Sequence, residues 1–219
     1  MISVAIDGPS SAGKSTVAKG VAKQLGFVYV DTGAMYRCVT LYALEHNVDC
    51  QNDEEVCKLL PFIDIELCIG GKVLLNGKDV THDIRTQPVV DNVSYIAANK
   101  GVRLFLVDIQ RDMAKDVSIV MDGRDIGTYV LPNANVKIFQ VADVKERAKR
   151  RYLENIEKGI ECTLEAVEKD LERRDYIDSH REFAPLCKAS DAIEVDTSYL
   201  TIEESIDTIV KIIKEKVGI

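Results

Sequence analysis

The chain has 219 residues, of which 46% are apolar and 29% are charged, and its formal net charge at pH 7 is −8. This composition is ordinary for a globular protein of one domain, and the length allows a sizeable core. The negative balance argues against a nucleic-acid partner, because a large nucleic-acid footprint usually needs a basic surface. No apolar run approaches the roughly 20 residues of a membrane span, and residues 1–7 lack the basic leader of a signal peptide.

The six cysteines include no CxxC pair, and none lies at metal-ligand spacing from one of the three histidines. We therefore expect reduced thiols and a cytoplasmic protein. We also expect a monomer with no nucleic-acid or membrane partner.

The first elements alternate between strand and helix. Residues 2–6 form a short apolar run typical of a buried strand, and residues 14–25 repeat at helical period up to Gly26, a plausible terminator. Residues 27–30 indicate a second strand that ends at Asp31, and residues 33–45 indicate the next helix.

The pattern changes in the next part of the chain. Apolar residues alternate with polar ones from Ile63 to Ile69, which is strand period two. Gly70-Gly71 and Asn76-Gly77 are turn sequences of the hairpin type. Antiparallel hairpins within a βα chain predict an inserted lobe over about residues 56–98. A helical stretch over residues 102–113 follows it.

The remaining chain returns to alternating strands and helices. Residues 117–121, 136–141 and 192–195 have buried-strand character. Helices are expected from residue 143 to about 158, from 163 to 174, and after Thr201, where Glu204 completes a capping-box pattern. The five apolar strands separated by helices predict an α/β fold, with a parallel sheet covered on both faces by helices.

Residues 8–15 read GPSSAGKS, which matches the phosphate-binding pattern GxxxxGK[ST] in full between an expected strand and an expected helix. The glycines let backbone N–H groups turn inward around phosphate oxygens, and the helix N-terminus adds partial positive charge. Lys14 can reach the β- and γ-phosphates of ATP, and Ser15 can ligate Mg²⁺. The sequence thus predicts a P-loop NTPase fold. The residues expected to bind ATP are Gly8, Pro9, Ser10, Ser11, Ala12, Gly13, Lys14, Ser15 and Thr16.

Two further segments follow strand ends, namely residues 31–37 (DTGAMYR) and residues 122–127 (DGRDIG). Ligands of open parallel sheets sit at the carboxyl ends of the strands, so both segments should face the same crevice as the phosphate loop. Arginine binds phosphate bidentately, which favours an anion site at Arg37 and Arg124. The alternative is that each arginine only holds its loop through a neighbouring aspartate.

Two clusters of charge lie near the C-terminal third. Residues 173–181 read RRDYIDSHR, and five basic residues occur between Lys145 and Arg151. Such runs are often only solvated helix faces. In a phosphoryl-transfer enzyme the basic run can instead form a lid that closes over ATP and excludes water.

Five segments together resemble the bacterial cytidylate kinase family over essentially the whole chain. They are IDGPSSAGKST (residues 6–16), DTGAMYR (31–37), DGRDIGT (122–128), RDYIDSHR (174–181) and APL (184–186). The resemblance implies a core over residues 1–55, 99–142 and 176–219. It also implies that the insert at about 56–98 binds the nucleoside monophosphate and that a helical lid spans about 143–175.

The resemblance also implies roles for individual residues. Arg37, Arg124 and Arg181 are similar to the clamps on the acceptor phosphate, whereas Ser94, Arg103 and Asp125 are similar to the cytosine readers. Asp178 resembles the ribose-hydroxyl ligand, with Arg174 supporting it, and Arg150 and Arg151 resemble the lid arginines. Family members often carry serine where Thr32 stands, so a hydroxyl remains at that position. The residues expected to be catalytic are Lys14, Arg124, Arg181, Arg150 and Arg151.

These expectations define a reaction, in which ATP phosphorylates CMP or dCMP to give ADP and CDP or dCDP. The exocyclic N4 amino group of cytosine donates to a carboxylate such as Asp125, whereas the O4 of uracil would be repelled by it. Mg²⁺ would be held by Ser15 and, through water, by Asp122. The alternatives are another small-acceptor P-loop kinase, for UMP, AMP or shikimate, and a nucleotide-binding switch without turnover.

Overall fold

The computed structural model describes residues 1–68, 70–157 and 159–219 and divides into two compact units. The first unit contains Met1–Tyr29 and Asp116–Ile219, and the second contains Val30–Lys115. The second unit is therefore an insertion in the chain of the first. No helix of the described residues is long and apolar enough to cross a membrane.

A five-stranded sheet with the order β2-β6-β1-β7-β8 forms the centre of the fold. The central strand β1 (Ser3–Asp7) pairs in parallel with β6 (Ile119–Gly123) and β7 (Val136–Val141). At one edge β8 (Ile193–Asp196) pairs in parallel with β7, and at the other edge lies β2 (Val28–Asp31). The predicted α/β fold with a five-stranded parallel sheet is confirmed.

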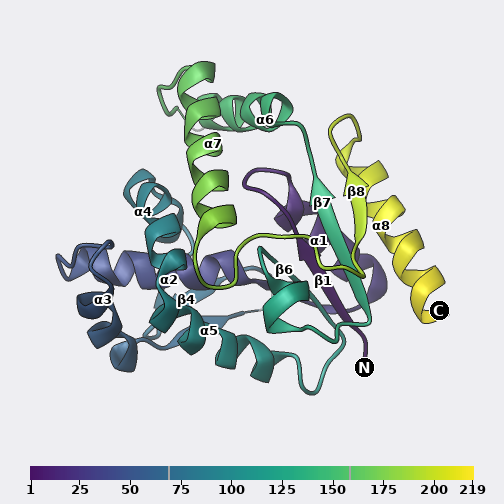
Figure 1. The fold of residues 1–219 in the computed structure, drawn as a ribbon, viewed down its shortest axis with the longest axis horizontal. Helices are drawn as coiled ribbons and strands as arrows, with labels where there is room; N and C mark the ends of the chain where they lie inside the picture. Colours follow the sequence, from purple (N-terminus) through teal and green to yellow (C-terminus); the bar gives the residue numbers. More distant parts are fainter. Residues whose placement is uncertain (69, 158) are drawn as a thin grey trace. The chain divides into compact units, whose positions relative to one another are not determined.

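Two helices of the first unit, α1 (Lys14–Leu25) and α8 (Ile202–Val217), lie side by side against the sheet (Figure 1). Their buried apolar residues join those of β1 and β7 in one cluster, which explains the apolar stripe at helical period in both segments. The capping box predicted at Thr201 is present, with Glu204 as its partner. Gly26 ends α1 in the left-handed conformation, as predicted.

Helices α6 (Val144–Glu157) and α7 (Leu164–His180) pack against each other through Ala148, Val167 and Leu171 (Figure 1). The prediction that the second helix ends at residue 174 is wrong, because no helix breaker occurs before Pro185 and the helix continues to His180. Lys158, the predicted end of the first helix, lies outside the described residues.

The segment after β6 was not predicted as an element, and it forms one π-helical turn, η3 (Ile126–Val130). Strand β6 itself is buried along its whole length, as expected of an interior parallel strand.

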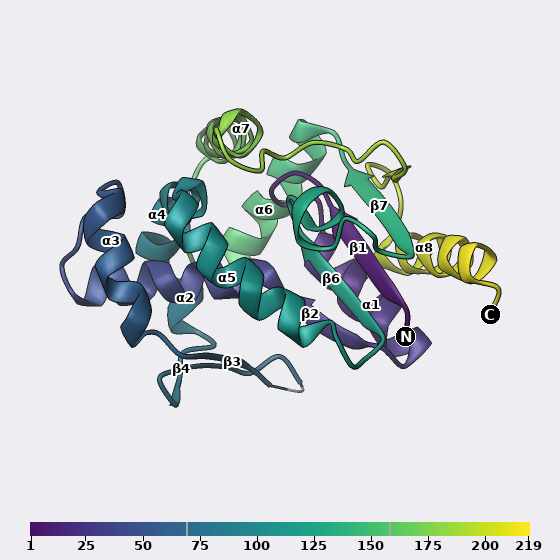
Figure 2. The ribbon, with the colours of Figure 1, turned by 60° about the horizontal axis from the view of Figure 1, so that its bottom comes forward.

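The second unit contains a three-stranded antiparallel sheet of β3 (Ile65–Leu67), β4 (Val73–Leu75) and β5 (Lys78–Asp79), seen at the lower edge of Figure 2. Asn76 and Gly77 both have positive φ angles at the β4–β5 turn, so the predicted hairpin turn is confirmed. Ile69, the last residue of the predicted alternation, lies outside the described residues.

Helices supply most of the second unit. They are α2 (Thr32–Glu45), α3 (Asp53–Leu59), α4 (Gln87–Ala98) and α5 (Lys100–Met113), with single 3-10 turns at η1 (Leu60–Phe62) and η2 (Asp83–Arg85). Helices α3 and α4 were not predicted from the sequence. Pro88, near the start of α4, stands where a helix tolerates proline, so it does not prevent this helix from forming.

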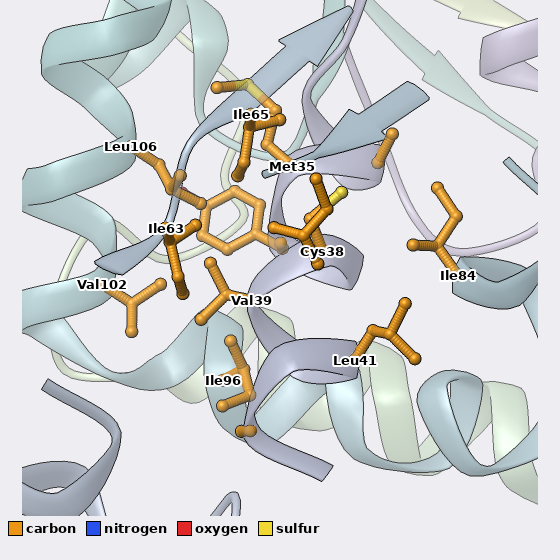
Figure 3. Packing of buried hydrophobic residues seen from close by; sticks show 14 of the residues in the cluster. Met35, Cys38, Val39, Leu41, Ile63, Ile65, Ile84, Ile96, Val102 and Leu106 are labelled. Carbon is orange, nitrogen blue, oxygen red and sulfur yellow. The ribbon is translucent and has the colours of Figure 1, made fainter. Parts of the chain in front are cut away.

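The core of the second unit is built from side chains of its helices and of the strands β3 and β4. Figure 3 shows Met35 and Val39 of α2 near Ile65 of β3, Ile96 of α4 and Leu106 of α5, all of them at most 6% exposed. This shared core holds α2, α4 and α5, which carry the candidate binding residues of this unit.

Candidate active site

The phosphate loop connects β1 to the N-terminus of α1, in the context that the sequence predicts. A Cβ on Gly8 would collide with the backbone carbonyl oxygen of Gln140 in β7, so only glycine fits where the loop comes this close to that strand. Gly13 adopts a left-handed conformation as the N-cap of α1. The loop therefore leads directly into the N-terminus of α1, where backbone N–H groups favour the binding of a phosphate.

Lys14 is only 5% exposed, and its Nζ donates a hydrogen bond to the carbonyl oxygen of Pro9 at 2.6 Å. Burial lowers the pKa of Lys14 to about 7, with a further contribution from the positive charge of Arg124. A negatively charged ligand at this position would favour the protonated form again. A phosphate group bound next to Lys14 would therefore keep its side chain positively charged.

The Asp122 carboxylate at the end of β6 is held by two hydroxyl groups. Ser15 Oγ donates to Oδ2 at 2.8 Å, and the Tyr29 hydroxyl donates to Oδ1 at 2.9 Å. The hydroxyl and carboxylate oxygens of Ser15 and Asp122 are the ligand types that Mg²⁺ prefers, so these residues fit the metal. Tyr29 was not predicted as a site residue, because a tyrosine inside an apolar strand belongs to no recognisable motif.

Charged residues form a network around Asp178 on α7. Arg124 Nε donates to Asp178 Oδ2 at 2.8 Å, and Arg181 lies 3.8 Å from Asp178 and 3.5 Å from Asp125. Burial alone would raise the pKa of Asp178, but the charges of Arg124 and Arg181 bring it below its usual value. Arg181 also donates twice to the carbonyl oxygen of Ala184. The structure thus brings together four residues that the sequence analysis selected: Arg124, Asp125, Asp178 and Arg181.

Arg174 adds a further guanidinium group to this network. Its Nε is buried and has no hydrogen-bond partner among the described residues. Burial lowers the pKa of Arg174, and the nearby charge of Arg124 lowers it further. Two close guanidinium groups with an unsatisfied donor are the arrangement that an anion would stabilise.

The segment that carries Arg124 and Asp125 is anchored by Asp7 at the end of β1. The Asp7 carboxylate accepts hydrogen bonds from the backbone N–H groups of Ile126 and Gly127, each at 2.8 Å. Burial raises the pKa of Asp7 to about 6, although the two hydrogen bonds oppose this shift. Asp7 was not predicted as a site residue, because its hydrogen-bond partners Ile126 and Gly127 lie far away in the chain.

The two predicted lid arginines have different surroundings. Arg150 donates to the carbonyl oxygens of Thr197 at 2.7 Å and Ser198 at 2.8 Å. Arg151 pairs with Glu154 at 3.2 Å near the surface. Their expected contact with the phosphates of ATP remains a prediction.

In the second unit, Asp31 organises the start of α2. It accepts the backbone N–H of Ala34 as the N-cap, pairs with Arg37 at 3.0 Å and lies 3.6 Å from Arg85. Burial opposes ionisation of Asp31, but Arg37 and these other partners bring its pKa below the usual value. Thr32, the first residue of α2, is 2% exposed. Asp31 and Arg85 were not selected from the sequence.

The two predicted cytosine readers of this unit, Ser94 on α4 and Arg103 on α5, are both buried. Arg103 is 1% exposed, donates to the carbonyl oxygen of Ala97 at 3.0 Å, and lies over the ring of Tyr36 at 5.3 Å from its centroid. A cation–π contact of this kind fixes the direction of the guanidinium group. Tyr36 was another residue that sequence reasoning did not select.

Two solved structures share this fold at low sequence identity. A crystal structure of an uncharacterized protein from Eubacterium ventriosum is 14% identical, with a TM-score of 0.52 and coverage of 98% of both chains. A gluconokinase from Sinorhizobium meliloti is 12% identical, with a TM-score of 0.51 over 98% of this chain and 92% of that chain. At this identity the likeness concerns the fold alone.

The sequence comparisons are much closer. A family model described as cytidylate kinase matches residues 4–215. The cytidylate kinase of Bacillus cytotoxicus is 53% identical over 98% of this chain and 96% of its own length. That of Pediococcus pentosaceus is 54% identical over 96% of this chain and 95% of its own, and that of Bacillus subtilis is 50% identical over 98% and 97%. With the phosphate loop and the arginine network in place, these matches show that the chain belongs to the cytidylate kinase family.

Proposed function

We propose that this protein transfers the γ-phosphoryl group of ATP to CMP or dCMP, giving ADP and CDP or dCDP. Membership of the cytidylate kinase family supports CMP or dCMP as the acceptor, and the complete phosphate loop supports ATP as the donor. The observation that carries the proposal is the buried Lys14 of that loop beside the guanidinium group of Arg124. Such a concentration of positive charge in a buried place suits the transfer of a phosphoryl group.

On the donor side, we assign the β- and γ-phosphates to the loop of residues 8–16, with Lys14 as the charged contact. Ser15 and Asp122 would hold Mg²⁺, Asp122 through water, and the bound metal would neutralise charge on the phosphate oxygens. Since both oxygens of Asp122 already accept hydroxyl hydrogens, its carboxylate keeps a fixed orientation.

On the acceptor side, we assign the phosphate of CMP to Arg37, Arg124 and Arg181. Arginine suits this role because its planar donors match phosphate oxygens in pairs. We assign the ribose hydroxyl groups to Asp178, whose carboxylate stays ionised because its pKa is lowered, with Arg174 as its support.

We assign the cytosine base to Asp125, Ser94 and Arg103, and an acceptor contact to Thr32. A carboxylate at Asp125 would accept from the N4 amino group of cytosine, and Arg103 would donate to O2 or N3. Uracil carries an oxygen where cytosine carries N4, so the same carboxylate would reject it.

The chemical step then requires little from the protein beyond position and charge. The acceptor phosphate monoester is largely dianionic at neutral pH, so its oxygen can attack the γ-phosphorus without a protein base. Lys14, Arg124 and Arg181 stabilise the negative charge that develops on the transferred group. We propose that Arg150 and Arg151 add further positive charge from the lid. We keep the layout of core, insert (about 56–98) and lid (about 143–175) as part of this proposal.

We also propose that the enzyme is a cytoplasmic monomer. All six cysteines are free thiols, which suits a reducing compartment. The formal net charge of −8 argues against a nucleic-acid partner, because a large nucleic-acid footprint usually needs a basic surface.

The test is a side-by-side measurement of ADP release with CMP, dCMP, UMP, AMP, GMP and shikimate at fixed ATP and Mg²⁺. We expect CMP and dCMP to give the largest kcat/KM. A larger value with another acceptor would identify a different small-acceptor kinase. ATP binding without ADP release for any acceptor would instead identify a nucleotide-binding switch.

A further inference from the structure

The peptide groups of Ser10, in the phosphate loop, are held on both sides by charged side chains from outside the loop. The N–H of Ser10 donates to Asp175 Oδ1 at 3.0 Å, and its carbonyl oxygen accepts from Arg147 Nη1 at 2.8 Å. Arg147 Nη1 also lies 2.6 Å from Asp175 Oδ2. The three groups therefore close a ring of hydrogen bonds around one residue of the loop.

Arg147 and Asp175 belong to the two helices that pack against each other, α6 and α7. Arg147 is fixed at a third point, because its Nε donates to the carbonyl oxygen of Ala142 at 2.9 Å. The side chains of Arg147 and Asp175 are 6% and 21% exposed, so solvent screens their attraction weakly. The position of both helices is thus coupled to Ser10.

The residues of the basic run near the start of α6 differ in their surroundings. Lys145 and Lys149 are exposed, as expected of a solvated face, whereas Arg147 is 5% exposed and faces the phosphate loop. Its donors at Nε and Nη1 are used by protein carbonyl oxygens and by Asp175. Its role in the loop is therefore to position the backbone.

The backbone next to Ser10 needs such support. Ser11 has φ of +57°, in the left-handed region that residues other than glycine rarely adopt. Conformations of this kind persist only where the surrounding structure holds them. The side chain of Ser10 is held as well, because its Oγ accepts from Arg124 Nη2 at 3.0 Å.

We propose that the Arg147–Asp175 pair is a positioning device that holds the Ser10–Ser11 backbone in the conformation that accepts the phosphates of ATP. The affinity for ATP then depends on the position of α6 and α7 relative to the phosphate loop. This inference rests on the proposed function only in taking ATP as the ligand of the loop, and neither residue is assigned a contact with a substrate.

The test compares matched substitutions on one helix. Asp175→Ala removes both contacts, and Asp175→Asn keeps an acceptor for the Ser10 N–H but loses the charge that faces Arg147. The control is Asp170→Asn, because Asp170 pairs with Arg173 at 2.7 Å on the same helix without reaching the loop. The dissociation constant of a non-hydrolysable ATP analogue is measured by calorimetry, and kcat and KM are measured for ATP and CMP.

We expect Asp175→Ala to raise the dissociation constant and the KM for ATP about tenfold or more, since a lost charge-assisted contact has roughly this effect. Asp175→Asn should give an intermediate increase, Asp170→Asn should match the original protein, and the KM for CMP should change less than the KM for ATP. In a double-mutant cycle, Arg147→Ala should add little once Asp175 is changed, because both act through the same ring.

An unchanged ATP affinity in folded Asp175→Asn, or fully additive effects of the two substitutions, would overturn the proposal. Circular dichroism and a thermal melt establish that each variant is folded, and the Asn variant, which keeps the shape of the side chain, carries the test if the Ala variant unfolds. ATP binding is measured without an acceptor. A failure of the CMP assignment therefore leaves this result intact, and a failure here leaves the CMP assignment intact.

Discussion

The Tyr29 hydroxyl and Asp122 Oδ1 are 2.9 Å apart, although 93 positions separate the two residues in the chain. Tyr29 donates to this oxygen while Ser15 donates to the other, so the carboxylate is oriented from both sides. Loss of a group that orients a metal-holding carboxylate typically weakens metal binding by roughly 10- to 100-fold, and we propose that Asp122 holds Mg²⁺ through water.

The Tyr29→Phe substitution tests this relationship. We expect the apparent affinity for Mg²⁺ to fall by roughly tenfold, because the Asp122 carboxylate loses a hydrogen-bond donor that helps to orient it. Loss of the hydrogen bond should also reduce the free energy of unfolding by about 1 kcal/mol. Activity as a function of Mg²⁺ concentration and urea denaturation measure the two effects. Tyr199→Phe is the control, since Tyr199 is 86% exposed, and equal Mg²⁺ requirements in both variants would contradict the role of Tyr29.

Replacement of Lys14 by alanine should reduce kcat by roughly 10²–10³ or more, because the lysine supplies charge where the transferred phosphoryl group becomes more negative. The exposed Lys19 lies on the same helix, so Lys19→Ala serves as the matched control. Steady-state rates at saturating substrates, with circular dichroism to show folding, decide the result. A folded Lys14→Ala enzyme with near-normal kcat would exclude the proposed mechanism.

Arg37 and Arg85 offer a matched pair for the acceptor phosphate, since both are ion-pair partners of Asp31. Arg37→Ala should raise the KM for CMP strongly, as a lost charge-assisted contact is worth about 1.5–3 kcal/mol. Arg85→Ala removes a more exposed cation from the same carboxylate and should have a smaller effect. The KM for CMP and the KM for ATP are measured in both variants. If Arg37→Ala changes only the KM for ATP, the assignment of Arg37 to the phosphate of CMP is wrong.

Asp125→Ala should narrow the preference for CMP over UMP, mainly by reducing kcat/KM for CMP. The substitution removes both the attraction to the N4 amino group and the repulsion of the uracil oxygen. Asp125 also lies 3.5 Å from Arg181, so a purely supporting role would reduce the activity with both substrates equally. The ratio of kcat/KM for CMP and UMP distinguishes the two roles, and an unchanged ratio means that cytosine is read elsewhere.

The raised pKa of Asp7 predicts a pH-dependent stability. The ordinary pKa of 3.8 becomes about 6 in the fold, so between these values the folded state binds more protons than the unfolded state. The contribution of Asp7 to stability therefore falls as the pH rises from about 4 to about 6, by about 3 kcal/mol in total at 1.36 kcal/mol per unit of pKa. Asp7→Asn should remove this slope, as measured by urea denaturation across this range.

A control residue, Asp191, is expected to change the stability with pH in the direction opposite to Asp7. Asp191 is exposed, and its hydrogen bond from Lys137 lowers its pKa, so its contribution is present above the ordinary pKa and is lost as the pH falls. The stability difference between the original protein and Asp191→Asn should accordingly shrink as the medium becomes more acidic. Identical slopes for Asp7→Asn and the original protein between pH 4 and 6 would refute the assignment of a raised pKa to Asp7.

The sequence by itself determined the features that are local in the chain. The phosphate loop is contiguous, and its backbone conformation follows from glycines at fixed spacing, so residues 8–15 could be identified directly. The five strands of the parallel sheet, the long helices and the Asn76-Gly77 turn follow from apolar period and turn chemistry. The family was predicted from the motifs and is confirmed by the match over residues 4–215.

The tertiary structure decided which charges meet. Arg147 and Ser10 are 137 positions apart, and Asp7 lies 119 positions from Ile126, so no periodicity connects them. Within the basic run, burial alone distinguishes Arg147 from its exposed neighbours Lys145 and Lys149. Helices α3 and α4 were missed because their short apolar patterns are ambiguous without the core that they share with α2 and α5. Side-chain pairing between distant segments depends on how the strands and helices pack, which a linear pattern does not encode.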